Sequence, residues 1–293
     1  MKKGFKRIGI IGRQRTTPET VDTVLMLVNM LSETGYEVLV EAETASTLPQ
    51  LSAPVMSKQK IGAENDLIIV VGGDGSLINA AHAVVDSGTP VLGINRGRLG
   101  FLTDIHPNEL KTKLQDVLAG DYFQEQRFLL QAGVYHDDTL LHQEIALNEV
   151  VLLPGEYSHM IEFEIYINEQ LMCSQRADGQ IIATPTGSTA YALSGGGPIL
   201  HPKLDAIVMV PMFSHSLSNR PIVVAGDSVV QLHVSEDNEM SPRVSCDGKQ
   251  RVAIHPGDSL VVKKYPKQLT LLHPCDYNYY ETLRSKLHWQ KKL

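Results

Sequence analysis

An apolar run that passes directly into a glycine turn limits what this chain can fold into. Leu67 to Val71 reads LIIVV, GGDG follows at residues 72–75, and a helical pattern begins at Leu77. A run that is apolar at every position predicts a strand buried on both faces, as in a parallel sheet. Ligands bind beyond the carboxyl ends of such strands, so the turn is a candidate binding site.

The first 126 residues repeat this alternation of strand and helix patterns. Thr17 is suited to cap a helix that starts at Pro18, and Gly120 is suited to end another one. Strands are predicted at residues 7–11, 36–40, 67–71 and 90–95, and further helices at 77–85 and 110–118. We therefore expect residues 1–126 to form an α/β domain with a mostly parallel sheet and helices on both faces.

The pattern changes after Gln126. Residues 161–167 alternate apolar and polar side chains, and residues 229–234 and 269–272 are also typical of strands. These features predict a β-rich domain over residues 127–275, with one face of each sheet buried. The following residues 276–293 contain a helix-compatible stretch at 279–292, and we expect this C-terminal tail to return to the first domain.

Charge and composition exclude several classes of protein. The net charge of −7 argues against a general binder of nucleic acid or of anionic membranes, although a local basic pocket for phosphate stays possible. The three cysteines form no CxxC pair, which gives a zinc site or a disulfide framework little support. The chain has no apolar run of 18 residues, and its N-terminal apolar run is too short for a signal peptide. A cytoplasmic protein is expected.

The GGDG turn has two interpretations. Glycines let a backbone approach a ligand closely, and successive N–H groups before a helix bind anions, whereas the simpler alternative is a tight turn with Asp74 as helix N-cap. Neither GxxxxGK[ST] nor GxGxxG occurs at the turn, so it is not a P-loop or a dinucleotide fingerprint. A carboxylate among glycines suits a base beside an acceptor hydroxyl, or a ligand of the magnesium that accompanies nucleotide phosphates, and so indicates a kinase.

A second candidate site is the stretch from Asp178 to Pro198, which is dense in glycine and in hydroxyl side chains. These groups suit the oxygens of sugars and phosphates, while an ordinary surface loop is the alternative. Asn148 and Glu149 stand between two apolar runs. They are either a strand end that faces a ligand, with Glu149 as partner of a ribose diol, or an ordinary turn.

The order and spacing of these motifs closely resemble the bacterial NAD kinases, and the enterobacterial type most of all. The resemblance rests on GGDG, on LNEVVL at 147–152 and on DGQIIATPTGSTAYALSGGGP at 178–198, and extends from GIIGR through GINRGRLGFLTD at 93–104 to HPCDY at 273–277. It implies a two-domain, NAD kinase-like fold. It also implies transfer of the γ-phosphoryl of ATP, with Mg²⁺ or another divalent metal, to the 2′-hydroxyl of the adenosine ribose of NAD. Members are cytoplasmic homo-oligomers, usually tetramers.

The resemblance also assigns roles to residues. It makes Asp74 the general base, with Gly75 beside it, and lets Asp178 reach the NAD of a neighbouring subunit. Near the end of the β-rich domain Lys249 stands where many members have a glutamine, unless a shift of one residue brings Gln250 there. The other residues that it implies for NAD binding are Asn148, Glu149, His159, Arg176, Thr189, Ala190, Tyr191, Ala192, Leu193 and Ser194. An aromatic ring suits a flat base, although Tyr191 as a core residue is the alternative.

Two other functions compete with this interpretation. A diacylglycerol-type lipid kinase shares GGDG, but it needs an apolar surface that faces a membrane, and this acidic chain has no basic amphipathic helix. A non-catalytic NAD(P)-binding regulator would keep the glycine-rich stretch without needing Asp74. The acid at position 74, where Asn would cap a helix equally well, favours the enzyme. Polyphosphate in place of ATP and a dimer in place of a tetramer stay open.

Overall fold

The chain forms two compact units. The structure is a computed structural model that describes residues 4–13, 17–97, 100–155, 159–249 and 251–289. The N-terminal unit runs over residues 1–126 and 267–293, and the second unit over residues 127–266. Leu271 and Leu272 pair with Val91 and Leu92, which places the last part of a long strand in the N-terminal unit, before the predicted boundary at 275.

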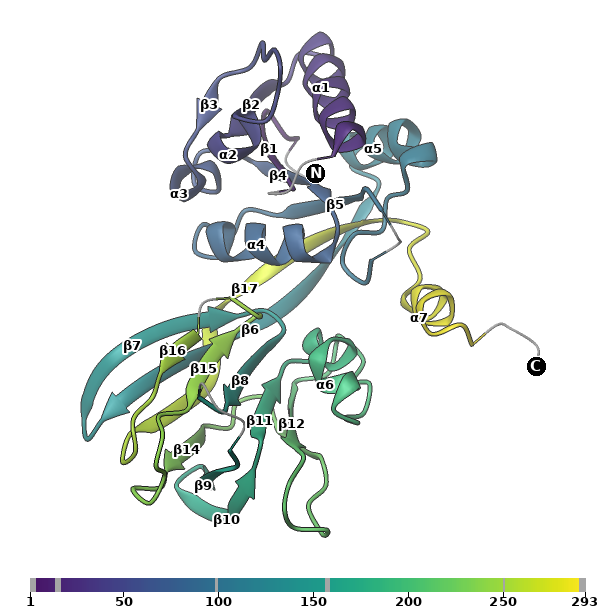
Figure 1. Ribbon diagram of the computed structural model, residues 1–293. Helices are drawn as coiled ribbons and strands as arrows, with labels where there is room; N and C mark the ends of the chain where they lie inside the picture. The colour runs from purple at the N-terminus through teal and green to yellow at the C-terminus, as the bar shows by residue number, and fades with distance from the viewer. Residues whose placement is uncertain (1–3, 14–16, 98–99, 156–158, 250, 290–293) are drawn as a thin grey trace. The chain divides into compact units, whose positions relative to one another are not determined.

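The N-terminal unit is built on a parallel sheet (Figure 1), with the strand order β17-β5-β4-β1-β2-β3. Every strand pair along this order within the unit is parallel. Its elements are β1 (Arg7–Gly12), α1 (Pro18–Glu33), β2 (Glu37–Glu41), α2 (Ala42–Ala45), β3 (Val55–Met56), α3 (Lys58–Ile61), β4 (Leu67–Gly72), α4 (Asp74–Val84), β5 (Val91–Asn95), η1 (Pro107–Glu109), α5 (Leu110–Ala119), the start of β6 (Tyr122–His136), the end of β17 (Ser259–Pro274) and α7 (Tyr279–Leu287).

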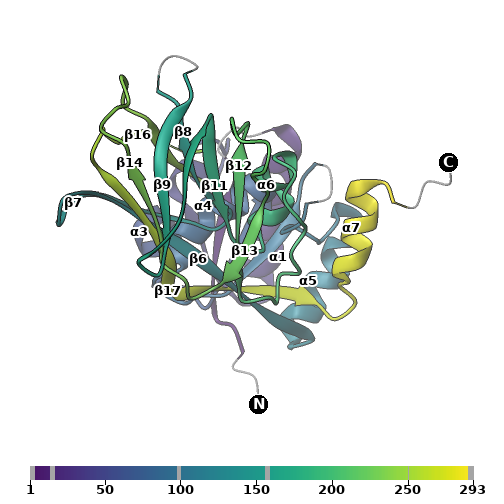
Figure 2. The same ribbon diagram turned by 90° about the horizontal axis from the view of Figure 1, so that it is seen from below.

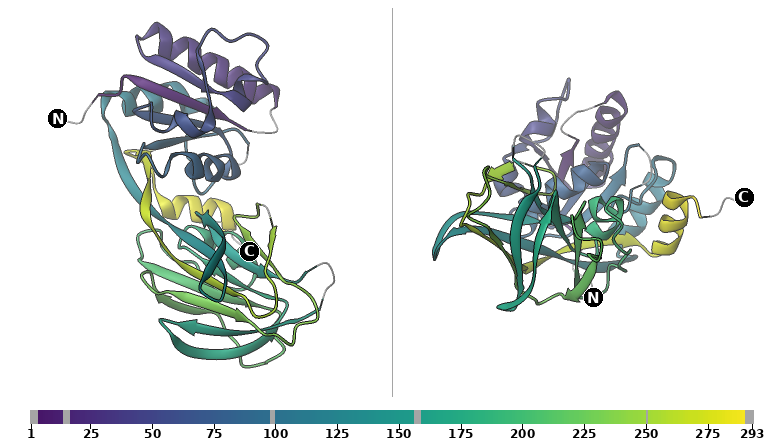
Figure 3. Two further views of the ribbon diagram at one scale, coloured as in Figure 1. Left: turned by 90° about the vertical axis from the view of Figure 1, so that its left-hand side faces the viewer. Right: turned by 60° about the horizontal axis from the view of Figure 1, so that its bottom comes forward.

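Helices cover both faces of this sheet, as the sequence predicts. Leu67, Ile69 and Val71 of β4 pack with the apolar sides of α1 and α5 in one buried cluster. On the other face, a Cβ at Gly93 of β5 would lie 3.0 Å from Leu77 of α4, so glycine there lets the helix pack close to the sheet. Figures 1 and 3 show α1 and α4 on opposite sides of the strands.

Two helix ends in this unit follow local sequence signals, although the Thr17 side chain makes no capping hydrogen bond. Thr17 is the N-cap of α1 and Pro18 its first residue, and Gly120 ends α5 with a φ of 102°. Helix α4 begins at Asp74 rather than at the predicted Leu77, and α7 ends at Leu287 rather than near Lys292. None of the helices over the described ranges is long and apolar enough to cross a membrane.

The second unit is β-rich and antiparallel, and Figure 2 shows several of its strands side by side. One sheet has the order β13-β12-β11-β8-β15-β16, and the other contains β10-β9-β14-β17, with β6 pairing with β7 and β17. The remaining elements are β7 (Thr139–Ala146), β8 (Glu149–Leu153), β9 (Ile161–Ile167), β10 (Gln170–Ala177), β11 (Gly179–Ala183), η2 (Gly187–Thr189), α6 (Tyr191–Ser194), β12 (Ala206–Met212), β13 (Ile222–Ala225), β14 (Val230–Val234), β15 (Arg243–Cys246) and β16 (Arg251–Ala253).

The middle of the six-stranded sheet is buried on both faces, which corrects the expectation of one buried face. Val150 and Leu152 of β8 face the main core, where Phe163 of β9 also packs. Val151, between them, packs instead in a cluster with Ile181 and Ala192 on the opposite face. The segment that contains α6 therefore covers the outer face of this sheet.

Candidate active site

Asp74 is the first residue of α4, and Gly73 is its N-cap. The alternative in which Asp74 caps the helix is therefore wrong. The Asp74 carboxylate instead accepts hydrogen bonds from the backbone N–H of Phe101 at 2.8 Å and of Leu102 at 3.0 Å. The fold thus holds this acid in a fixed direction at the carboxyl end of β4.

The glycines of the turn have different roles. A Cβ at Gly72 would lie 2.3 Å from Ser76 Oγ, so the packing of the turn requires glycine there. A Cβ at Gly73 or Gly75 would meet nothing within 4 Å, and neither residue has a positive φ. Because glycine in a helix costs about 0.5–1 kcal/mol relative to alanine, Gly75 is not explained by the stability of the fold. The space that a Cβ at either position would enter is open.

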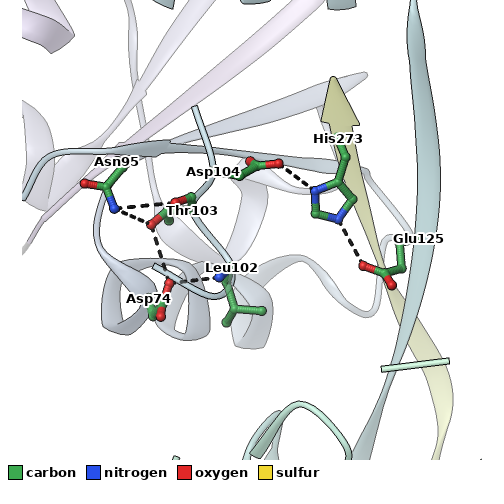
Figure 4. A network of polar contacts seen from close by, with 7 residues as sticks. All are labelled: Asp74, Asn95, Leu102, Thr103, Asp104, Glu125 and His273. Atoms are coloured by element: carbon green, nitrogen blue, oxygen red, sulfur yellow. Dashed lines mark hydrogen bonds and ion pairs between the residues drawn. The ribbon is translucent and has the colours of Figure 1, made fainter. Parts of the chain in front are cut away.

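The loop that faces Asp74 is itself anchored in β5. Asn95 Nδ2 donates to Thr103 Oγ1 at 3.0 Å, and the Thr103 hydroxyl lies 3.4 Å from Asp74 Oδ1 (Figure 4). Asn95 and Thr103 are both fully buried. A Cβ at Gly100 would lie 2.0 Å from Asp74 Oδ1, so only glycine fits between this loop and the carboxylate.

In the second unit, Asp247 organises the turn that carries Asn148 and Glu149. Its carboxylate accepts the backbone N–H groups of Leu147 at 2.8 Å, Asn148 at 2.8 Å and Glu149 at 3.2 Å. Asp247 has a φ of 51°, and the N–H of Lys249 donates to the Cys246 carbonyl at 3.0 Å to close its turn. Asp247 is not among the site residues predicted from the sequence, although the Asp-Gly pair is a signal for such a turn. The predicted Gln250 lies outside the described residues.

The TPTG segment packs against the same turn. The Thr184 hydroxyl donates to the Leu147 carbonyl at 2.6 Å, and the Thr184 N–H donates to the Asn148 carbonyl at 2.9 Å. A Cβ at Gly187 would lie 2.1 Å from the Asn148 carbonyl oxygen. Asn148 thus lies in a turn between β7 and β8, as one of the two alternatives predicts, and three motifs that are far apart in the sequence meet around it.

Glu149 is the most perturbed acid of this cluster. Burial, and then the charge of Asp247, raise its pKa from 4.5 to about 7, although the backbone N–H of Tyr191 opposes the shift. Its Oε2 is buried and has no hydrogen-bond partner in the described part of the chain. A buried acceptor without a partner is suited to an incoming donor such as a ribose hydroxyl.

The TAYALS residues present different groups to the solvent. Tyr191 is 43 % exposed, so its alternative role as a core residue is wrong. Thr189, Ala190 and Leu193 are half-buried and Ser194 is exposed. Ala192 is fully buried against the six-stranded sheet, which leaves only its backbone for a ligand.

His159 and Arg176 lie together elsewhere in the second unit. Both line a pocket of about 330 Å³ with Glu162 and Asn238. Arg176 Nε lies 3.4 Å from Glu162 Oε1, and both side chains are substantially exposed. Asp178 is half-buried and its N–H donates to the Met212 carbonyl at 2.9 Å.

Arg127 gave no signal in the sequence. It is 3 % exposed, and its Nη1 donates to Thr186 Oγ1 at 3.1 Å inside the TPTG segment. It stands at the start of an otherwise apolar strand segment, where an arginine is usually read as a surface residue. The structure makes it a buried support of the glycine-rich segment.

The side chains that could act as metal ligands decide which kind of metal site the chain can form. Over the described residues, no group of three or more His, Cys, Asp or Glu side chains could hold a metal ion. Mg²⁺ in kinase sites is held by one or two carboxylates together with water and substrate phosphates. Asp74, the single acid of its turn, fits a magnesium ion that arrives with a nucleotide.

Comparison with solved structures defines the fold class. The chain superimposes on yeast NADH kinase, solved in complex with NADH, with a TM-score of 0.89 at 24% identity, covering 100% of this chain and 90% of that one. An NAD kinase from Archaeoglobus fulgidus, solved in complex with ATP, gives a TM-score of 0.74 at 22% identity, covering 95% of this chain and 99% of that one. The two-unit fold is thus the fold of the NAD(H) kinases, as predicted.

Sequence comparison defines the family. The family models described as the ATP-NAD kinase N-terminal and C-terminal domains match residues 8–122 and 147–273. An NAD kinase of Legionella pneumophila (strain Paris) is 51% identical over 293 residues, covering 100% of this chain and 99% of the relative. An NAD kinase of Pseudomonas entomophila (strain L48) is 53% identical over 289 residues, covering 99% and 97%. The chain belongs to the ATP-NAD kinase family and is an enzyme of that class, which confirms the predicted resemblance.

Proposed function

We propose that this kinase transfers the γ-phosphoryl of ATP to the 2′-hydroxyl of the adenosine ribose of NAD, with Asp74 as the general base. The observation that carries the proposal is the environment of the Asp74 carboxylate. The N–H groups of Phe101 and Leu102 orient it, and the Cβ sides of Gly73 and Gly75 leave room beside it.

The reaction needs positioning and charge neutralisation more than covalent chemistry. The ribose 2′-oxygen bonds to the γ-phosphorus, ADP leaves with the electron pair of the broken P–O bond, and Asp74 takes the hydroxyl proton. A base within hydrogen-bond reach of the hydroxyl contributes about 10²–10⁴-fold in rate. Two backbone donors leave lone pairs on the Asp74 oxygens, which supports this role.

The cluster around Glu149 is proposed to hold NAD. Its buried Oε2 acceptor suits a ribose diol, and the exposed ring of Tyr191 suits the face of a base. Asn148 presents its side chain from a backbone that Asp247 and Thr184 hold rigid. The remaining residues proposed to contact NAD are Gly75, His159, Arg176, Asp178, Thr189, Ala190, Ala192, Leu193, Ser194 and Gln250.

Mg²⁺ is proposed to enter with ATP. When bound, it neutralises phosphate charge as the phosphoryl group is transferred. Contact of Asp74 with this magnesium ion is the alternative to its role as the base, because both roles use the carboxylate of the glycine turn.

We further propose a cytoplasmic homotetramer. Phe213 is 80% exposed and Leu217 92% exposed in the segment between β12 and β13. Strand β13 is an edge strand of the six-stranded sheet, and its residues Ile222 and Val223 are exposed. Apolar side chains beside an open strand edge suit contact with another copy of the chain. The three cysteines are free, as in proteins of reducing compartments.

The proposed activity is tested with purified protein, NAD, ATP and Mg²⁺. Product is measured by coupling to an NADP-specific dehydrogenase, with polyphosphate as a parallel donor and with no metal as a control. NADP that forms only with metal and phosphoryl donor supports the proposal. NAD binding by calorimetry without NADP formation would instead favour the non-catalytic regulator.

A further inference from the structure

His273 lies between two carboxylates inside the N-terminal unit (Figure 4). Its Nδ1 is 2.8 Å from Asp104 Oδ2, and its Nε2 is 3.1 Å from Glu125 Oε2. The side chains are 1%, 9% and 7% exposed, in the order His273, Asp104, Glu125. The ring of Tyr277 stacks on the imidazole with centroids 4.1 Å apart, and that of Phe123 with centroids 5.2 Å apart. The imidazole is therefore held at both nitrogens and packed against two aromatic rings.

The three groups form a buried cluster of one imidazole and two carboxylates. Burial alone would lower the pKa of His273, but the hydrogen bonds to Asp104 and Glu125 outweigh it and raise this pKa above its ordinary value. A protonated ring donates from both nitrogens, which is the arrangement that two carboxylate acceptors require. Asp104 is thereby fixed to β17 through a charged, buried hydrogen bond.

Asp104 belongs to the loop that orients Asp74. Phe101 and Leu102, in the same loop, donate their N–H groups to the Asp74 carboxylate, and the Gly100 N–H donates to the Thr103 carbonyl at 3.3 Å to close the turn. Directly after Asp104, Ile105 bridges to Ile94 of β5. The loop is thus tied down by β5 backbone on one side and by the His273 side chain on the other.

We propose that the Asp104–His273 pair is a positioning pair for Asp74. The pair holds the loop so that the Phe101 and Leu102 amides direct the carboxylate at the ribose hydroxyl. This inference rests on the proposed function, because it assumes that Asp74 is the base. Displacement of a catalytic group by about 1 Å costs as much as 10²-fold in rate, so loosening the loop lowers turnover without removing a contact to NAD.

Glu125 provides a matched control. It is buried as deeply as Asp104 and bonds the same imidazole, but it lies on β6 and not in the loop. Asp104→Asn and Glu125→Gln each replace one carboxylate of the cluster by its amide. Both variants remove one carboxylate charge beside His273, whereas only the first loosens the attachment of the loop.

The test compares Asp104→Asn, Glu125→Gln and His273→Gln with the wild type in kcat, in KM for NAD and in thermal midpoint. Asp104→Asn and His273→Gln are expected to lower kcat by about 10- to 100-fold with KM for NAD within about twofold of wild type. Glu125→Gln is expected to keep kcat within about threefold of the wild type. This holds even if its thermal midpoint falls as far as that of Asp104→Asn. Equal losses of kcat for Asp104→Asn and Glu125→Gln, or wild-type kcat for Asp104→Asn, would overturn the proposal.

Amide hydrogen exchange in residues 100–104 gives a second readout that needs no turnover. Asp104→Asn is expected to speed exchange at Phe101 and Leu102, and Glu125→Gln is not. Unchanged exchange in Asp104→Asn would show that the pair does not hold the loop. Faster exchange with undiminished kcat would show that the pair holds the loop without positioning Asp74 for turnover, which overturns the proposal. Failure of the proposed function has a different result, because wild-type protein would then form no NADP.

Discussion

Gly100 and Asp74 fit together so closely that a single methyl group would not fit between them. A Cβ at Gly100 would lie 2.0 Å from Oδ1 and 2.8 Å from Cγ of Asp74. Asp74 begins helix α4 and Gly100 belongs to the loop after β5, and the contact sets the direction in which the carboxylate points.

Gly100→Ala is therefore expected to damage turnover. The methyl group must push the Asp74 carboxylate or the loop away, and we expect kcat to fall by about 10- to 100-fold while KM for NAD changes little. Steady-state kinetics with the coupled NADP assay measures both. Gly4→Ala, whose Cβ would meet nothing within 4 Å, is the control. Wild-type kcat for Gly100→Ala would show that the orientation of Asp74 is unimportant.

Gly73→Ala separates ligand approach from stability. The added Cβ would meet no atom within 4 Å in the folded chain, so the thermal midpoint should fall only by the small cost of alanine in place of glycine at the N-cap of α4. If the space beside Gly73 receives a substrate, kcat/KM should nevertheless fall by at least about tenfold, since overpacking of a filled site costs about 1–3 kcal/mol. Thermal melts and kinetics on the same preparation test this. A variant that is as active as wild type would mean that the open space is not used.

Local patterns in the sequence were sufficient to predict those helices and strands whose bounds are set by residues within the element or next to it. The strand at residues 67–71, the start of α1 at Pro18 and the end of α5 at Gly120 all lie where the sequence predicts them. Each follows from periodicity or from a capping residue, and these signals act within a few positions along the chain.

Long-range contacts account for what the sequence could not predict. The strand Gly179–Ala183 was not predicted, because it lies in a stretch rich in glycine and hydroxyl side chains. It is defined instead by its pairing with β8 and β12. The partners of Asp74 lie 27 and 28 residues further on, and those of Asp247 about 100 residues back. No periodicity in the sequence indicates contacts between residues so far apart along the chain. The motifs could therefore be predicted as site residues, but the hydrogen bonds that hold them in place could not.

The raised pKa of Glu149 predicts a pH-dependent effect of Glu149→Gln on stability. Burial, followed by the charge of Asp247, raises this pKa from 4.5 to about 7. A raised pKa in the folded state means that the stability contributed by the protonated acid is complete below pH 4.5 and is lost as the pH rises through about 7. Glutamine cannot ionise, so the variant should be more stable than wild type at pH 8, by at most about 3 kcal/mol, and by less than about 1 kcal/mol at pH 5.

Urea denaturation at the two pH values measures this difference. A Glu149→Gln variant with the same advantage at pH 5 and pH 8 would show that Glu149 is not held as a buried acid.

Asp247→Asn is expected to weaken NAD binding more than turnover. The carboxylate satisfies three N–H groups of the turn that carries Asn148 and Glu149, and an amide accepts through only one oxygen. We expect a loss of about 1–3 kcal/mol in stability and a raised KM for NAD. Kinetics together with calorimetric titration of NAD measure the effect. A variant with raised KM but wild-type NAD affinity would contradict the role of this turn in binding.

The role of Asp74 as the base is the central claim, and Asp74→Asn tests it most directly. Asparagine keeps the size of the side chain and an oxygen for one backbone N–H, but it cannot take the proton of the ribose hydroxyl. NADP formation should fall by about 10²–10⁴-fold, while calorimetry should give an NAD affinity within a few-fold of wild type. Near-normal NADP formation by Asp74→Asn would contradict the account.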